Sequence, residues 1–155
     1  MVISHIQPTC MPSSDDHPGY SQIVKDDFYA YFAGIVAADF PEGQEVLGDV
    51  RGETRVLLNK IREMLAEIAI DMDRIVRVDV HLANFDEFEK MDAVYREFFK
   101  EGRYPARTTT ESPSLYGRVE WRLLVWQGYY KSLNLYFGIL RPPRPPFRNI
   151  RRDFC

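Results

Sequence analysis

One arginine in this chain stands where its side chain could bind an anion. Arg107 comes just before a run of three threonines in the segment Tyr104–Thr110, two residues after a proline that marks a loop. A guanidinium group is planar and permanently charged, and it can donate two parallel hydrogen bonds to a carboxylate. Those two bonds would fix the orientation of the ligand. The segment therefore predicts a binding site for a small carboxylate at Arg107.

Two further segments make this arginine motif more specific. Gly19-Tyr20-Ser21-Gln22 lies near the N-terminus, and Met91–Phe99, which reads Met-Asp-Ala-Val-Tyr-Arg-Glu-Phe-Phe, lies just upstream of the arginine. In this order and spacing, and with the long helix-like segment Thr54–Leu65 between them, the segments resemble the Rid/YjgF family of reactive intermediate deaminases. Some members of that family carry endoribonuclease L-PSP labels. The resemblance covers residues 18–127.

The resemblance implies a hydrolase that deaminates small 2-imino or 2-enamino carboxylates without a cofactor. In the family, the arginine that matches Arg107 binds the substrate carboxylate, and the tyrosine that matches Tyr20 lines the cleft. Asp92 falls where many relatives carry asparagine. Thr109 follows Arg107 by two residues and so projects from the same face of a strand, where it could bind the ligand. Family members are homotrimers with ligand clefts between subunits, and we expect the same here.

Each of these residues also has a plain structural explanation. Arg107 could form an ion pair at the surface or between subunits, and Tyr20 could be a loop aromatic that packs on the domain. Asp92 could be a solvated helix residue. Thr109 could simply suit a strand, because β-branched side chains favour strands. The sequence leaves both explanations open at all four positions.

The family pattern breaks at the expected last strand. The deaminases usually carry a glutamate there, which is thought to orient or activate the hydrolytic water. An ungapped comparison from Arg107 places Arg122 at that position. Glu120 lies two residues earlier, on the same face of the strand, and is the remaining candidate for proton transfer. The serine and glutamine of the family's Ser-Gly-Gln segment are also replaced, by Ala33 and Ile35.

The altered pocket leaves more than one function open. The leading interpretation is an imine/enamine deaminase in which Arg107 holds the carboxylate and Glu120 or water moves the protons. Loss of the usual glutamate favours a second one, a carboxylate-binding protein without catalysis. If Arg122 also faces the cleft, the site suits a dianion such as an aminomuconate-like compound. An RNA-active protein is disfavoured because nucleic acid prefers a basic face, and most of this chain is acidic.

Composition and charge indicate a single globular domain. The chain has 155 residues, of which 45% are hydrophobic, enough to form a substantial core. Its net charge is −3, but residues 128–155 carry +5, so the remainder carries −8. No apolar run is long enough to cross a membrane and no secretory signal is visible, so we expect a cytoplasmic location. The two cysteines and the scattered histidines lack the spacing of a metal site, and we expect neither a metal nor a cofactor.

The periodicity of apolar residues predicts the elements that must position these side chains. A helix is expected over Thr54–Ile68, followed by a strand over Ile75–Leu82 that is buried on one face. A second helix follows, capped by Asn84 or Asp86. Its apolar stripe, interpreted as core, consists of Phe88, Met91, Tyr95, Phe98 and Phe99.

Shorter strands are expected at Tyr29–Gly34, Thr108–Thr110 and Val119–Trp126, with a turn at Pro41–Gln44. This order of elements predicts an α+β fold, a mixed β-sheet with two α-helices packed on one face. The resemblance refines that prediction to a chorismate mutase-like arrangement that assembles as a homotrimer.

The expected domain organisation has three parts. Residues 1–17 form an irregular lead-in, residues 18–127 form the Rid-like domain, and residues 128–155 form a basic, Pro-rich extension. A polyproline-type segment in the extension cannot join a helix or a central strand. The extension either packs its aromatic side chains on its own or a neighbouring subunit, or is sequence foreign to the family.

Overall fold

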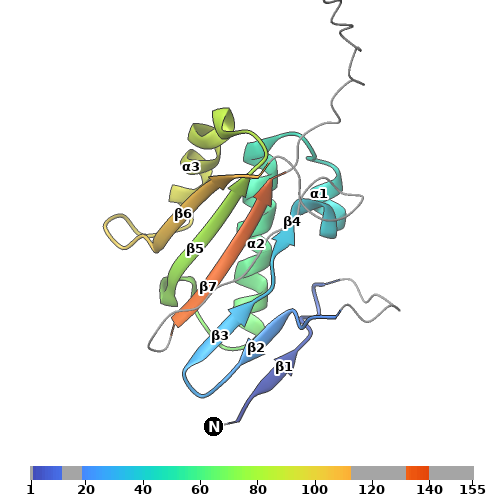
Figure 1. Ribbon diagram of the computed structural model, residues 1–155, viewed down its shortest axis with the longest axis vertical. Helices are drawn as coiled ribbons and strands as arrows, with labels where there is room; N and C mark the ends of the chain where they lie inside the picture. The colour runs from blue at the N-terminus through green and yellow to red at the C-terminus, as the bar shows by residue number, and fades with distance from the viewer. Residues whose placement is uncertain (1, 12–18, 113–131, 140–155) are drawn as a thin grey trace, which may run out of the picture.

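A mixed β-sheet forms the centre of the computed structural model, which describes residues 2–11, 19–112 and, as backbone, 132–139 (Figure 1). Its strands are β1 (Ser4–Ile6), β2 (Ile23–Lys25), β3 (Tyr29–Phe32), β4 (Ile35–Val36), β5 (Ile75–Leu82), β6 (Ala106–Glu111) and β7 (Ser132–Ile139). The strands are arranged in the order β1-β2-β3-β7-β5-β6, with β4 also pairing with β7. The β1, β2 and β3 strands are antiparallel, whereas β3, β7, β5 and β6 run parallel to one another.

The two longer helices lie on the same face of this sheet (Figure 1). The helices are α1 (Pro41–Gln44), α2 (Val50–Glu67) and α3 (Phe88–Glu97), with short 3-10 turns η1 (Ala37–Asp39), η2 (Met72–Arg74) and η3 (Phe85–Glu87). The predicted α+β fold, a mixed sheet with two helices on one face, is confirmed. The turn expected at Pro41–Gln44 is the single helical turn α1. Among the described residues, no helix has both the length and the apolar character needed to span a bilayer.

The core forms between α2 and the central strands. One face of α2 is fully buried and carries the apolar side chains Leu57, Leu58, Ile61, Met64 and Leu65. These residues belong to the same core cluster as Val78, Val80 and Leu82 of β5. Each fully buried aliphatic side chain stabilises the fold by roughly 1.5–3 kcal/mol relative to an exposed one, as an upper estimate. The strand predicted over Ile75–Leu82 is therefore the one on which the helical layer packs.

Capping residues set the two ends of α2. The helix begins four residues before the predicted start because Asp49 is the N-cap and its Oδ1 accepts a hydrogen bond from the Arg51 N–H at 3.1 Å. At the other end, the N–H of Ile70 donates to the carbonyl of Leu65 at 3.0 Å. This contact places Ala69 in the left-handed region, with φ 57°. Glycine usually occupies that position, because a Cβ atom is disfavoured there.

The second predicted helix is present as α3, and its apolar stripe packs into the core as predicted. Met91, Tyr95 and Phe99 are buried, while Phe88 and Phe98 are half-buried against the same cluster. The predicted capping residue Asn84 caps the 3-10 turn η3 that precedes α3, rather than α3 itself. The Oδ1 of Asn84 accepts a hydrogen bond from the N–H of Asp86 at 3.1 Å and so caps η3, which leads directly into α3.

The structure places a strand in each of the two terminal parts that were expected to lie outside the Rid-like domain. The lead-in expected to be irregular over residues 1–17 contains β1, which is too short for its alternation to be recognised. The extension expected over residues 128–155 contains β7, which pairs with β3 on one side and β5 on the other. Its sequence, Ser-Leu-Asn-Leu-Tyr-Phe-Gly-Ile, is rich in apolar residues, as is typical of a strand between two neighbours. The strand predicted at Val119–Trp126 lies outside the described residues.

Candidate functional site

Arg107 projects from β6 onto α3. Its Nη1 donates a hydrogen bond to Oδ1 of Asp92 at 2.7 Å, and only 19% of the arginine side chain is exposed. The central guanidinium carbon lies 4.6 Å from the ring centroid of Tyr95 and 5.3 Å from that of Phe88. Both distances are within the range of cation–π attraction. The ion pair and the two rings together hold the arginine in one orientation.

Asp92 is buried and uses both of its carboxylate oxygens. While Oδ1 binds Arg107, Oδ2 accepts a hydrogen bond from Nε of Arg96 at 2.6 Å, and 9% of the aspartate side chain is exposed. Burial alone would raise the pKa of Asp92. The hydrogen bonds and charges of Arg107 and Arg96 outweigh burial, so this pKa lies below its usual value. The carboxyl group is therefore ionised at neutral pH, and the three side chains carry one net positive charge.

Arg107 has hydrogen-bonding capacity beyond its bond to Asp92. A guanidinium group has five N–H donors. Among the described residues, the hydrogen-bond partner of Arg107 is Asp92, reached through Nη1. The edge formed by Nε and Nη2 presents two parallel N–H groups, the geometry that binds a carboxylate bidentately. The bond to Asp92 therefore leaves this edge of the guanidinium group unused.

Thr109 shares this side of β6 with Arg107. Side chains alternate along the strand, and Arg107 and Thr109 are the two partly buried residues in it. Arg107, Asp92 and Thr109, with the rings of Phe88 and Tyr95, make up what we call the arginine half-site. Three of the predicted residues are thus brought together on β6 and α3.

Tyr20 lies outside the strands, in a bend before β2. It precedes β2, is 48% exposed, and is separated from β6 by the intervening strands β3, β7 and β5. Four strand spacings correspond to about 19 Å. The altered segment Ala33-Gly34-Ile35 lies beside it, because the N–H of Ala33 donates to the carbonyl of Gln22 at 2.7 Å. We call Tyr20 with this segment the tyrosine half-site, and within one chain it does not meet Arg107.

The remaining two predicted site residues, Glu120 and Arg122, lie outside the described residues. The structure also adds three residues of α3 that the sequence interpretation did not assign to the site: Phe88 and Tyr95, which contact Arg107, and Arg96, which binds Asp92. They stand four residues before, three after and four after Asp92, and residues at these spacings share one face of a helix. That spacing was the signal that could have identified them.

A polar ladder covers the sheet face opposite the helices. Arg77 Nε donates to Asp79 Oδ2 at 2.8 Å, and Arg77 Nη2 also donates to the hydroxyl of Thr108 at 3.2 Å. His81 is partly buried, and its Nδ1 lies 2.6 Å from the hydroxyl oxygen of Thr110. Burial lowers the pKa of His81, although the nearby charge of Asp79 acts in the opposite direction. These side chains tie β5 to β6.

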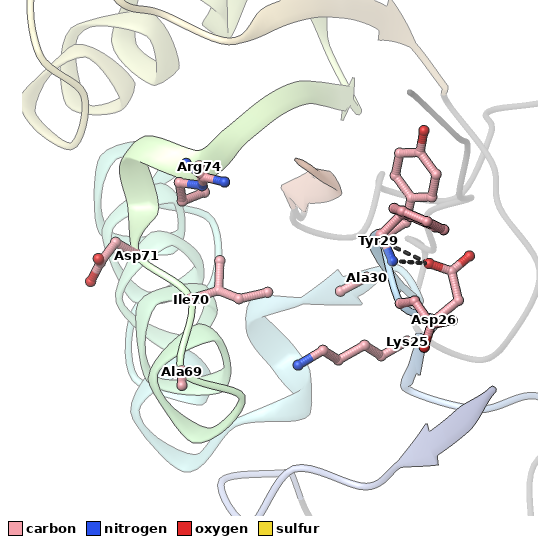
Figure 2. A pocket seen from close by; sticks show the side chains of 10 residues that line it. Lys25, Asp26, Tyr29, Ala30, Ala69, Ile70, Asp71 and Arg74 are labelled. Carbon is pink, nitrogen blue, oxygen red and sulfur yellow. Dashed lines mark hydrogen bonds between the residues drawn. The ribbon is translucent and has the colours of Figure 1, made fainter. Parts of the chain in front are cut away.

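A separate cavity of about 440 Å³ lies between the β2–β3 turn and the segment that connects α2 to β5. Figure 2 shows Lys25 and Arg74 reaching into this space beside Ile70 and Ala30. The carboxylate of Asp26 is engaged in the turn, where its Oδ1 accepts from the N–H groups of Phe28 and Tyr29 at 2.7 and 2.6 Å. None of the predicted site residues that the structure describes lines this cavity. Within the described ranges, no cluster of three or more His, Cys, Asp or Glu residues could hold a metal ion.

This fold and the sequence place the protein in a known class. The sequence profile of the family described as endoribonuclease L-PSP matches residues 14–123, well over half of the chain. The chain therefore belongs to this family, the Rid family, as the resemblance predicted.

Individual relatives support this assignment. The chain is 33% identical over 118 residues to the 2-iminobutanoate/2-iminopropanoate deaminase of Bos taurus, covering 75% of this chain and 85% of that protein. It is 34% identical over 92 residues to a RutC family protein of Pyrococcus horikoshii, covering 59% of this chain and 72% of that one. Among solved structures, a protein of the conserved Rid family from Yersinia pestis superposes with a TM-score of 0.67 at 26% identity, covering 80% of this chain and 94% of that one.

Proposed function

We propose that this protein is a cofactor-independent deaminase that hydrolyses small 2-imino or 2-enamino carboxylates. The observation that carries the proposal is Arg107, which is four-fifths buried and bound to Asp92 through Nη1, so that its Nε and Nη2 are not used by that bond. The relative in Bos taurus is named for deamination of two such acids, 2-iminobutanoate and 2-iminopropanoate. An arginine with its orientation fixed before the ligand binds loses less entropy on binding, which favours a functional site.

The reaction requires little besides orientation and proton transfer. Water adds to the carbon of the C=N bond, the nitrogen is protonated, and ammonia leaves as the carbonyl forms. Arg107 holds the carboxylate next to the reacting carbon and so limits the poses that the imine can take. We assign the proton transfers to Glu120 or to water, a contribution of roughly 10²–10⁴-fold where a carboxylate performs it. Thr109 and Tyr20 line the same cleft.

The proposal places this cleft between two subunits of a homotrimer. Within one chain, β2, which follows Tyr20, and β6, which carries Arg107, are four strand spacings apart, about 19 Å. A ligand the size of an imino acid cannot contact both. A neighbouring copy that brings its Tyr20 next to this Arg107 would complete the site, and cyclic symmetry would repeat the cleft at each interface.

An alternative on the same fold is a carboxylate-binding protein without catalysis. It is favoured by the sequence around the expected last strand, where Arg122 stands in place of the usual glutamate. It predicts ligand binding that depends on Arg107, with no turnover above the spontaneous rate. The cytoplasmic location expected from the sequence also stays a prediction, which cell fractionation would test.

The first test follows the lifetime of a freshly generated imine. An amino-acid oxidase produces the imino acid, semicarbazide traps what has not been hydrolysed, and wild type is compared with Arg107→Ala. We expect wild type to shorten the imine lifetime, and the variant to lose about 10–100-fold in kcat/KM, because charge-assisted hydrogen bonds to the carboxylate are lost. Arg103→Ala is the matched control, since it removes an equal charge from the exposed loop before β6.

The outcomes separate the two candidate functions. Hydrolysis that depends on Arg107 and not on Arg103 supports the deaminase. If wild type leaves the imine lifetime unchanged while calorimetry detects Arg107-dependent binding of a 2-oxo acid, the protein binds without catalysis. Equal activity of Arg107→Ala and wild type would remove Arg107 from the site altogether.

A further inference from the structure

Any ligand carboxylate at Arg107 would have to share that arginine with Asp92. The aspartate cannot easily swing away, because its two oxygens accept hydrogen bonds from Arg107 at 2.7 Å and from Arg96 at 2.6 Å. Its side chain is only 9% exposed, so water does not replace these partners. Asp92 therefore places a fixed negative charge beside the edge of Arg107 that would bind the ligand.

The charge balance at this place favours a ligand with one negative charge. Arg107 and Arg96 contribute two positive charges and Asp92 one negative charge. One ligand carboxylate therefore neutralises the group. The effective positive charge near the ligand is smaller than this sum of formal charges, because the Arg96 side chain is 65% exposed and its charge is largely screened by water. A second ligand carboxylate would meet the buried charge of Asp92 with little left to offset it.

We propose that Asp92 is a specificity-determining residue that makes the site select substrates with a single carboxylate over those with two. This inference rests on the proposed function, because it assumes that Arg107 binds the substrate carboxylate. It also opposes the interpretation of the site as one for dianions, which depends on Arg122. A fixed negative charge within a few ångströms of a second carboxylate, in surroundings between a protein surface and water, disfavours binding by a factor on the order of ten.

The replacement Asp92→Asn tests the charge with little change in shape. The amide retains an oxygen that can accept from Arg107, while the negative charge disappears. Glu97→Gln is the matched control. It removes the same charge from the same helix, but Glu97 pairs with Arg55 of α2, at 2.6 Å, and makes no contact with Arg107 among the described residues.

The assay compares kcat/KM for the imine generated from alanine with kcat/KM for the imine generated from aspartate. We expect wild type to prefer the alanine imine, and Asp92→Asn to shift the ratio toward the aspartate imine about tenfold. Glu97→Gln should leave the ratio unchanged. An unchanged ratio in Asp92→Asn, or wild type that already prefers the aspartate imine, would overturn the role of Asp92 while leaving the deaminase intact.

A binding measurement keeps the inference testable if no imine is hydrolysed. Calorimetry with pyruvate and with 2-oxoglutarate reports the affinity for one and for two carboxylates in the same variants. If wild type hydrolyses no imine yet binds pyruvate more tightly than 2-oxoglutarate, and Asp92→Asn shifts this binding preference, the deaminase is refuted and the role of Asp92 is supported. If Asp92→Asn and Glu97→Gln shift this preference equally, the effect comes from the net charge of the protein, and the specific role of Asp92 is overturned. Binding of neither probe by wild type would refute both proposals.

Discussion

Arg107 takes its orientation from residues of a different element. The sequence identified Arg107, Asp92 and Thr109 as candidates, and the structure places all three in the arginine half-site. It did not identify the ring contacts of Arg107, because pairing between α3 and β6 depends on how a helix packs on a strand. Arg96 could have been found from its spacing of four residues from Asp92 on the same helix. The sequence also identified Tyr20 as a candidate. The subunit whose Arg107 it would face depends on how the chains assemble.

The buried aspartates predict a loss of stability in acid. Burial tends to raise the pKa of Asp79, but the hydrogen bond and charge of Arg77 outweigh it, so this pKa lies below its usual value. A group with a lowered folded-state pKa stabilises the protein above its unfolded-state pKa, and that contribution is lost as the pH falls through the folded-state pKa. The free energy of unfolding should therefore decrease as the pH is lowered below about 4.

Urea unfolding between pH 7 and pH 3 measures this effect. Asp79→Asn should be less stable than wild type at pH 7, with a smaller loss on acidification, because the ionisable group is gone. Asp73→Asn, which removes an exposed carboxylate from η2, serves as the control. If the free energy of unfolding of Asp79→Asn falls as steeply with pH as that of wild type, other groups determine the acid sensitivity.

Secondary structure was predictable wherever a periodic apolar pattern extended over several turns or residues. The bounds predicted for the strand Ile75–Leu82 are those observed, and α2 differs at its ends because caps, rather than periodicity, determine where a helix begins and ends. The three-residue strand β1 is too short to show a period. The strand β7 was missed because the family resemblance ended before it, so its apolar residues were assigned to an extension.

The end of α2 offers a test of backbone strain. Ala69 adopts φ 57° within the capping turn, and its side chain is exposed. Ala69→Gly should stabilise the protein by roughly 0.5–1 kcal/mol, because glycine adopts this conformation without a Cβ penalty. Chemical denaturation measures the change. Ala66→Gly, an exposed site within regular helix, should instead destabilise by a similar amount. Destabilisation by both variants would show that the strain at Ala69 is negligible.

At the scale of the whole molecule, Tyr20 and Arg107 lie in separate regions of one chain, and the proposed function therefore requires two chains. The proposed cleft takes Tyr20 from one subunit and Arg107 from another. Sedimentation gives the size of the assembly directly. The shared site itself calls for a functional test.

Complementation between two inactive variants provides that test. Tyr20→Ala and Arg107→Ala should each be impaired in imine hydrolysis. When both are co-expressed with different tags and mixed oligomers are isolated through both tags, some interfaces combine an intact Tyr20 with an intact Arg107. A trimer that contains both variants has one intact cleft among its three interfaces, whichever variant is present twice. Recovery near a third of wild-type activity supports the shared cleft, whereas mixed oligomers as inactive as either parent would place the whole site within one chain.

The position of β7 also governs how the chain can acquire its structure. This strand lies between β3 and β5, yet it follows both of them in sequence by about fifty residues or more (Figure 1). As the polypeptide emerges from the ribosome, β1–β3 and β5–β6 can form early, but each presents an unpaired strand edge until β7 arrives. Such edges invite pairing with other chains, and contacts that distant in sequence slow folding. Protection of the nascent chain by a chaperone would matter most during that interval, before the last strand joins the two halves of the sheet.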